Sequence, residues 1–125
     1  MTINETAKAA HENAKSKGFF DEPKNIVEML CLIHSEVSEA LEAHRIGNEK
    51  YFDGGNLTEF VKTASDNSFK SQFERSIKNC FADELAAIMI RVMDLAAFKG
   101  IDLEAHLAAK MRYNSLRPHK HGKKY

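Results

Sequence analysis

The chain has 125 residues, 43% of them hydrophobic, which is enough for one domain with a real core and too little for two ordinary ones. Its 18 Lys and Arg residues balance its 18 Asp and Glu residues, so the formal net charge is zero. We therefore expect a single domain over residues 1–125 and no specific nucleic-acid partner.

The charges are unevenly distributed along the chain. No Asp or Glu follows Glu104, whereas six Lys and Arg residues do, so the last part carries +6 and residues 1–104 carry −6. An acidic body with a basic tail at about 116–125 suits an anionic ligand that approaches a carboxylate site. It equally suits weak nucleic-acid contact or plain solubility.

Cysteine usage and the absence of long apolar runs predict where the protein resides. Cys31 and Cys80 both lie in predicted helices among apolar neighbours, which is typical of reduced core cysteines in a cytoplasmic protein. No apolar run approaches the roughly 20 residues of a membrane span, and the N-terminus lacks the regions of a signal peptide. We expect a soluble, cytoplasmic protein with no membrane partner.

The first predicted helix runs from about residue 3 to 17. Thr2 and Glu5 form a capping box at its start, and Gly18 ends it. The loop that follows carries Phe19 and Phe20. These rings either plug a gap between helices or stack on a flat ligand such as a nucleotide base.

The second predicted helix begins near Pro23, which suits a first turn, and continues to Gly47. At 100° per residue, Glu36 points among the apolar residues of this helix, whereas Glu42 falls on the far side. Carboxylates are rarely buried without a partner, so a cation is expected beside Glu36. Glu39, one turn along, can reach the same cation.

Residues 48–70 lose helical periodicity and are predicted as an irregular insertion. A turn is expected at 53–56, followed by a short helix over about 57–64 that is capped by Asn56 or Thr58. Gly54 and Gly55 have no Gly-Lys-Ser/Thr after them, so this is not a P-loop.

Two further helices complete the predicted fold. Ser71 and Glu74 form a capping box that opens a long helix to Gly100, with Glu84 in the centre of its apolar stripe. The last helix is capped by Asp102 and runs to about 115. Nothing alternates with period two, so the expected fold is all-α, an antiparallel bundle of four main helices that is completed by homo-oligomerisation.

Three acids, Glu36, Glu39 and Glu84, thus face inward from two helices that a bundle sets side by side. Clustered carboxylates repel one another and must share protons or hold a metal, and oxygen ligands favour Mg²⁺. Alternatively, Glu36 and Glu84 pair with Arg91 or Lys110 as internal salt bridges.

Two segments resemble the signature of the MazG-type all-α nucleoside triphosphate pyrophosphohydrolases. Residues 35–43 resemble its first half, Glu-Glu-x-x-Glu, and residues 83–96 its second half, Glu-x-x-Asp. Residues 110–124 resemble the ending of a phage-like and bacterial branch. Ser35 replaces the first Glu of the signature, and Ala87 replaces its final Asp, which is a metal ligand in the family. Asp94 lies on nearly the same face as Ala87 but roughly 10 Å further along the helix.

The resemblance implies that a nucleoside triphosphate is hydrolysed to the monophosphate and pyrophosphate. Glu36, Glu39 and Glu84 would be the catalytic, metal-binding residues, with Mg²⁺ or Mn²⁺ as the ion and Asp94 as a further candidate ligand. The implied substrate contacts are Lys110, Asn114 and Arg117 for the phosphates and Phe19 or Phe20 for the base. The implied assembly is a homodimer or homotetramer. Because of Ala87, the alternative is a weak or silent homologue that binds nucleotide or a protein partner.

Overall fold

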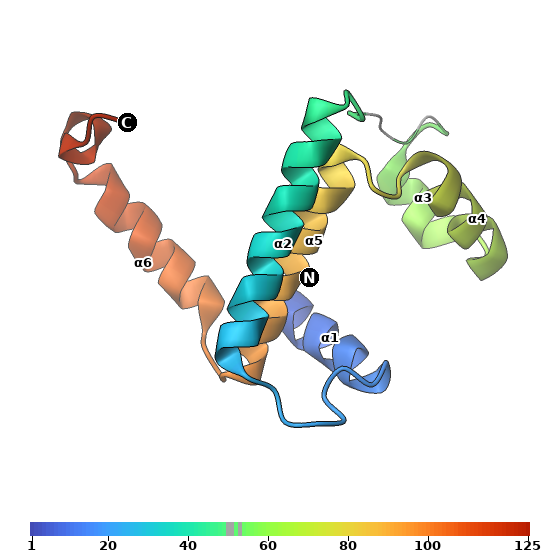
Figure 1. The fold of residues 1–125 in the computed structure, drawn as a ribbon, viewed down its shortest axis with the longest axis horizontal. Helices are drawn as coiled ribbons and strands as arrows, with labels where there is room; N and C mark the ends of the chain where they lie inside the picture. Colours follow the sequence, from blue (N-terminus) through green and yellow to red (C-terminus); the bar gives the residue numbers. More distant parts are fainter. Residues whose placement is uncertain (50–51, 53) are drawn as a thin grey trace. The chain divides into compact units, whose positions relative to one another are not determined.

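The computed structural model describes residues 1–49, 52 and 54–125, and this part of the chain contains α-helices, one short 3₁₀ helix and no strand (Figure 1). The all-α prediction is therefore confirmed. The helices in order are α1 (Ile3–Ser16), α2 (Ile26–Arg45), α3 (Leu57–Thr63), α4 (Asp66–Ser76), α5 (Phe81–Phe98), α6 (Leu103–Ser115) and the 3₁₀ helix η1 (His119–Gly122).

The chain divides into two compact units. The first comprises residues Met1–Lys24 and Val92–Tyr125, and the second comprises Asn25–Arg91. The single domain expected from chain length stays a prediction. Within the described residues, no helix combines the length and the apolar character that crossing a bilayer requires.

In the first unit, the starts of α1 and α6 are joined by side-chain hydrogen bonds. The predicted capping box of α1 is present, since Glu5 N–H donates to Thr2 Oγ1 over 3.1 Å and Thr2 N–H donates to the Glu5 carboxylate. Asp102 caps α6 as predicted and also accepts a 2.7 Å hydrogen bond from the Asn4 amide. That hydrogen bond is the main cause of the lowered pKa of Asp102.

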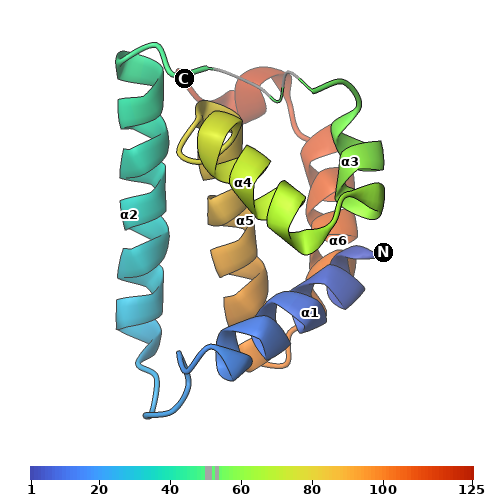
Figure 2. The same ribbon diagram turned by 90° about the vertical axis from the view of Figure 1, so that its right-hand side faces the viewer.

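In the second unit, α2 and the first part of α5 run alongside each other in opposite directions (Figures 1 and 2). A ring contact agrees with the opposite directions. The His44 ring near the end of α2 lies 5.9 Å from the ring of Phe81, the first residue of α5. Helix α2 is capped by the Asn25 side chain, which accepts from two backbone N–H groups. Pro23 precedes this cap, so the prediction that it lies in the first turn was wrong.

The long helix predicted from Ser71 to Gly100 is in fact two helices. Ser65, not Ser71, caps α4, and the chain leaves helical geometry at Asn79, whose φ is 67°. Asparagine tolerates this left-handed conformation better than most residues. Its N–H donates to the Asp83 carboxylate over 2.8 Å. This hydrogen bond joins the left-handed residue to the first turn of α5.

The segment predicted as an irregular insertion contains short helices with their own aromatic contacts. Helix α3 is present as predicted, with the Asn56 side chain accepting from Glu59 N–H over 3.1 Å. The expected turn at 53–56 lies partly outside the described residues. A row of four rings links this segment to α4, with centroid separations of 4.8, 5.9 and 5.9 Å: Phe52, Phe60, Phe69 and Phe73.

The two cysteines have different environments. Cys80 is only 2% exposed and lies just before α5, in agreement with a core position. Cys31 is exposed on α2, so the prediction that it is a core residue was wrong. Both are free thiols.

Candidate metal centre

Three carboxylates meet in the second unit. Glu36 and Glu39 come from α2 and Glu84 from α5, and one carboxylate oxygen of each lies within 4.8 Å of the other two. The spacing of three residues places Glu36 and Glu39 on one face of α2, and the neighbouring α5 supplies the third acid. Glu84 is 6% exposed, Glu36 is partly buried and Glu39 is exposed. The cluster therefore has a buried end and an end open to solvent.

One cation contacts this cluster. Arg91 Nε donates to Glu36 Oε1 over 2.7 Å, so the salt-bridge alternative predicted for Glu36 is present. Neither Glu84 nor Lys110 makes an ion pair within the part of the chain that the structure describes. Among residues 1–49, 52 and 54–125, a single guanidinium thus faces three carboxylates, and the most buried of them has no counter-ion.

The pKa values of the three acids follow from this imbalance. Burial, together with the charges of Glu39 and Glu36, raises the pKa of Glu84 to about 7. Burial also acts to raise the pKa of Glu36, but the hydrogen bond from Arg91 and further interactions outweigh it, so that pKa is lowered. Interaction with Glu36 raises the pKa of Glu39. Glu84 is therefore the acid of the cluster that takes up a proton as the pH falls through about 7.

The donors fit a hard divalent ion. Mg²⁺ binds each ligand oxygen at about 2.1 Å, so two oxygens on opposite sides of the ion lie roughly 4.2 Å apart. The three carboxylate oxygens lie within 4.8 Å of one another, which is close to that separation. Carboxylates without nitrogen or sulfur donors favour Mg²⁺ or Mn²⁺ over zinc. A divalent ion would also supply the positive charge that Glu84 lacks.

Three other positions of α5 bear on the set of possible ligands. Ala87, one turn after Glu84 on α5, offers only a methyl group. Asp83 accepts the hydrogen bond from Asn79. Asp94 belongs to the first unit, where its Oδ1 lies 2.8 Å from His11 Nδ1. A ligand role for Asp94 stays a prediction.

The residues predicted to contact phosphates all lie in the first unit. Lys110 Nζ lies 5.5 Å and Arg117 Cζ 5.4 Å from the centre of the Tyr113 ring, so this ring holds both cations by cation–π contacts. The Asn114 side-chain oxygen is buried without a hydrogen-bond partner among the described residues. The sequence interpretation missed Tyr113, although its spacing of three from Lys110 and four from Arg117 is a helical-face signal.

The two aromatic residues predicted to stack on a base differ in their surroundings. The Phe20 ring lies 4.7 Å from the His11 ring and 5.1 Å from the Phe98 ring, which matches the alternative of a hydrophobic plug. Phe19 is 63% exposed, with Lys24 Nζ 5.9 Å from its ring centre. Phe19 is thus the ring with a face available for stacking.

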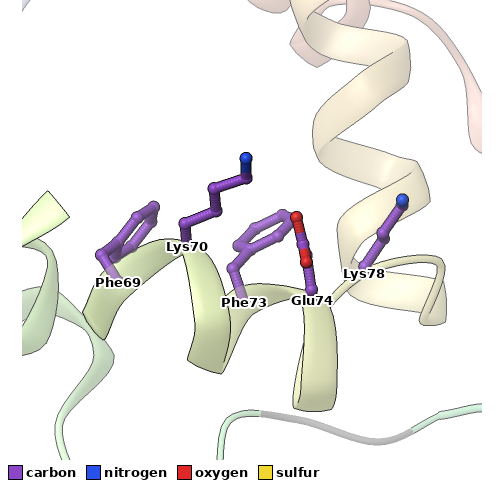
Figure 3. Close-up of a pocket in the computed structure, with 5 residues that line it drawn as sticks. All are labelled: Phe69, Lys70, Phe73, Glu74 and Lys78. Carbon is purple, nitrogen blue, oxygen red and sulfur yellow. The ribbon is translucent and has the colours of Figure 1, made fainter. Parts of the chain in front are cut away.

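A separate hollow of about 390 Å³ lies on α4 (Figure 3). The long side chains that line it extend to the same side of the helix, with the ring of Phe73 between them. Its lining consists of Phe69, Lys70, Phe73, Glu74 and Lys78. With one acid among two basic residues, the hollow lacks the ligand set of a metal site, and it contains none of the predicted site residues.

Comparisons of the chain with models of protein families, with curated proteins and with solved structures found no match.

The raised pKa of Glu84 predicts a dependence of stability on pH. Between pH 4.5 and about 7 the folded state holds a proton that the unfolded state has released, so the free energy of unfolding falls as pH rises. Chemical denaturation of the metal-free protein should show a loss of about 2–3 kcal/mol from this group between pH 5 and 8. Glu84→Gln removes this titration, so its stability should increase relative to the wild type over the same range.

Glu42→Gln is the matched control, because Glu42 is an exposed acid of α2 outside the cluster. It should follow the wild-type pH profile. Parallel profiles for the wild type and Glu84→Gln would contradict the assigned proton.

Proposed function

We propose that the protein is a soluble, cytoplasmic, Mg²⁺-dependent nucleoside triphosphate pyrophosphohydrolase, with Mn²⁺ as a possible substitute. The observation that carries this proposal is the gathering of Glu36, Glu39 and Glu84 within 4.8 Å, with no counter-ion for the buried Glu84 among the described residues. These are the same three acids that the resemblance to MazG-type enzymes implicates. A ribonucleoside or deoxyribonucleoside triphosphate would yield the monophosphate and pyrophosphate.

The three acids have different parts in this proposal. A divalent ion held by them would neutralise the substrate phosphates and make a bound water more acidic. Glu39 is the exposed member of the three, so it is the acid placed to accept the proton of a water that attacks the α-phosphorus. The bond from the α-phosphorus to the bridging oxygen breaks, and pyrophosphate leaves. Glu36 and Glu84 would hold the ion together with Glu39.

Residues of the first unit have the chemistry that substrate binding needs. Lys110 and Arg117 supply positive charge for phosphate oxygens. The Asn114 oxygen, which has no partner among the described residues, can accept a hydrogen bond from the ligand. The Phe19 ring is available to stack on a base.

Ala87 supports a second candidate function. The MazG-type signature has an acid at this position, and a site with one ligand fewer binds its ion more weakly. The protein would then be a weak or silent homologue that binds nucleotide or a protein partner.

We also propose that the chain completes a MazG-like four-helix bundle by forming a homodimer or homotetramer. Large apolar side chains of the second unit are exposed at helical spacing on α2 and on the first part of α5. They are Val27, Leu30, Val37, Leu41, Leu85 and Met89. Exposed apolar stripes of this kind are typical of surfaces that a second copy covers.

The oligomer can be tested by light scattering. The wild type should have at least twice the mass of a monomer, because pairing removes the apolar stripe of α2 from water. Val37→Glu with Leu41→Glu should shift the mass towards the monomer, while Glu42→Gln on the same helix should not. A monomeric wild type at high protein concentration would contradict this part of the proposal.

Activity can be tested with a panel of canonical and modified nucleoside triphosphates in the presence of Mg²⁺. Pyrophosphate release should fall at least roughly 100-fold in Glu36→Gln and Glu84→Gln, because each variant removes a ligand charge. Glu42→Gln is the control and should retain full activity. Nucleotide binding without pyrophosphate release from any substrate would favour the silent homologue.

The effect of position 87 separates the two candidate functions. Ala87→Asp adds an acid one turn from Glu84, and we expect tighter Mg²⁺ binding and roughly tenfold faster pyrophosphate release. Isothermal titration and the same assay measure these effects, with Ala87→Asn as a control of similar size and no charge. If Ala87→Asp behaves like Ala87→Asn, the missing acid does not limit the site.

A further inference from the structure

We propose that Arg91 is a resident cation that competes with the divalent ion for Glu36 and so sets the metal affinity of the cluster. This inference rests on the proposed metal site and names how that site is regulated. The contact that carries it is the 2.7 Å hydrogen bond from Arg91 Nε to Glu36 Oε1. A small divalent ion bound to that oxygen at about 2.1 Å would lie close to the positive guanidinium, and the two cations would repel each other.

The electrostatics of the cluster favour an exchange of cations. With Arg91 bound, the guanidinium cancels one of the charges that attract a divalent ion. Both cations also need the ionised form of Glu36, which Arg91 stabilises. The ion must therefore displace Arg91 from this oxygen or bind with a weaker set of ligands.

The guanidinium is held in a way that allows it to leave. Its contact with Glu36 uses Nε alone, and its two terminal nitrogens have no hydrogen-bond acceptor within the described part of the chain. The Arg91 side chain is 39% exposed, whereas that of Glu36 is 13% exposed. Arg91 can thus move into solvent, while Glu36 stays in the cluster.

The sequence of α5 explains why Arg91 crosses to α2. Charged pairs on one helix form at spacings of three and four. Four residues before Arg91 stands Ala87, which has no charge. Three residues after it stands Asp94, which is paired with His11 in the first unit. With no free acid at either spacing, the guanidinium binds Glu36. The absence of an acid at position 87 therefore explains why Arg91 is available to bind Glu36.

Metal binding by Arg91 variants tests the inference. Isothermal titration with MnCl₂ and MgCl₂ at pH 8, without nucleotide, should show roughly tenfold tighter binding in Arg91→Ala than in the wild type. Arg91→Gln keeps most of the stem and a neutral donor, so it should bind the ion more tightly as well. Arg91→Lys keeps the charge and should stay near the wild type. Thermal denaturation checks that each variant is folded.

Arg45→Ala is the matched control. Arg45 is an exposed residue of the same unit that faces Glu42 at 3.8 Å, so its removal changes the net charge equally without touching the cluster. It should leave the metal affinity unchanged. Tighter binding in Arg45→Ala to the same degree would overturn the inference, because net charge alone would then explain the effect.

The outcomes distinguish this inference from the proposed function. If the wild type binds the ion and Arg91→Ala binds it no more tightly, the competition is overturned while the metal site stands. If the wild type binds no ion and Arg91→Ala does, the competition is supported in its strongest form. If neither binds an ion, the metal site is overturned and the inference with it.

Discussion

The candidate site depends on one constraint: three carboxylates are gathered and partly buried, and only one cation contacts them among the described residues. Glu84 is nearly inaccessible to solvent, and its neighbours across the cluster are two further acids. An isolated carboxylate in such a place is costly, so it is protonated or it gains a cation. The cluster meets this constraint in part with Arg91 on Glu36 and in part with a proton on Glu84. A divalent ion would replace both.

The antiparallel pairing of α2 with the first part of α5 creates this constraint. Each helix alone would leave its acids in water, where Glu36 and Glu39 would be ordinary surface residues. The pairing brings Glu84 to them and removes solvent from one side of the cluster. Packing of the two helices and ionisation of the cluster are thus coupled, and removing the charge of Glu84 is expected to strengthen the pairing at high pH.

Local signals in the sequence predicted the starts of three helices correctly, whereas the starts expected at Pro23 and Ser71 were wrong. The side chains of Thr2, Asn56 and Asp102 cap the helices that were expected at those positions. These interactions span only three residues, so the sequence around each cap is sufficient to specify it. The prediction of one continuous helix from Ser71 to Gly100 failed at Asn79. The apolar periodicity of a helix can continue across a single left-handed residue that interrupts the backbone. The spacing of apolar residues predicts which residues share one face of a helix, but it does not predict whether the helix is continuous.

The sequence by itself determined that Glu36 has apolar neighbours on a helix and therefore needs a positive partner, because the helical period decides which residues share a face. It also determined that Ala87 offers no ligand. Only the tertiary structure decided which cation Glu36 receives and that Glu84 receives none from the part of the chain that the structure describes. Those facts depend on atomic distances between two helices that are far apart in the sequence, and the choice between Arg91 and Lys110 as partners could not be made without them.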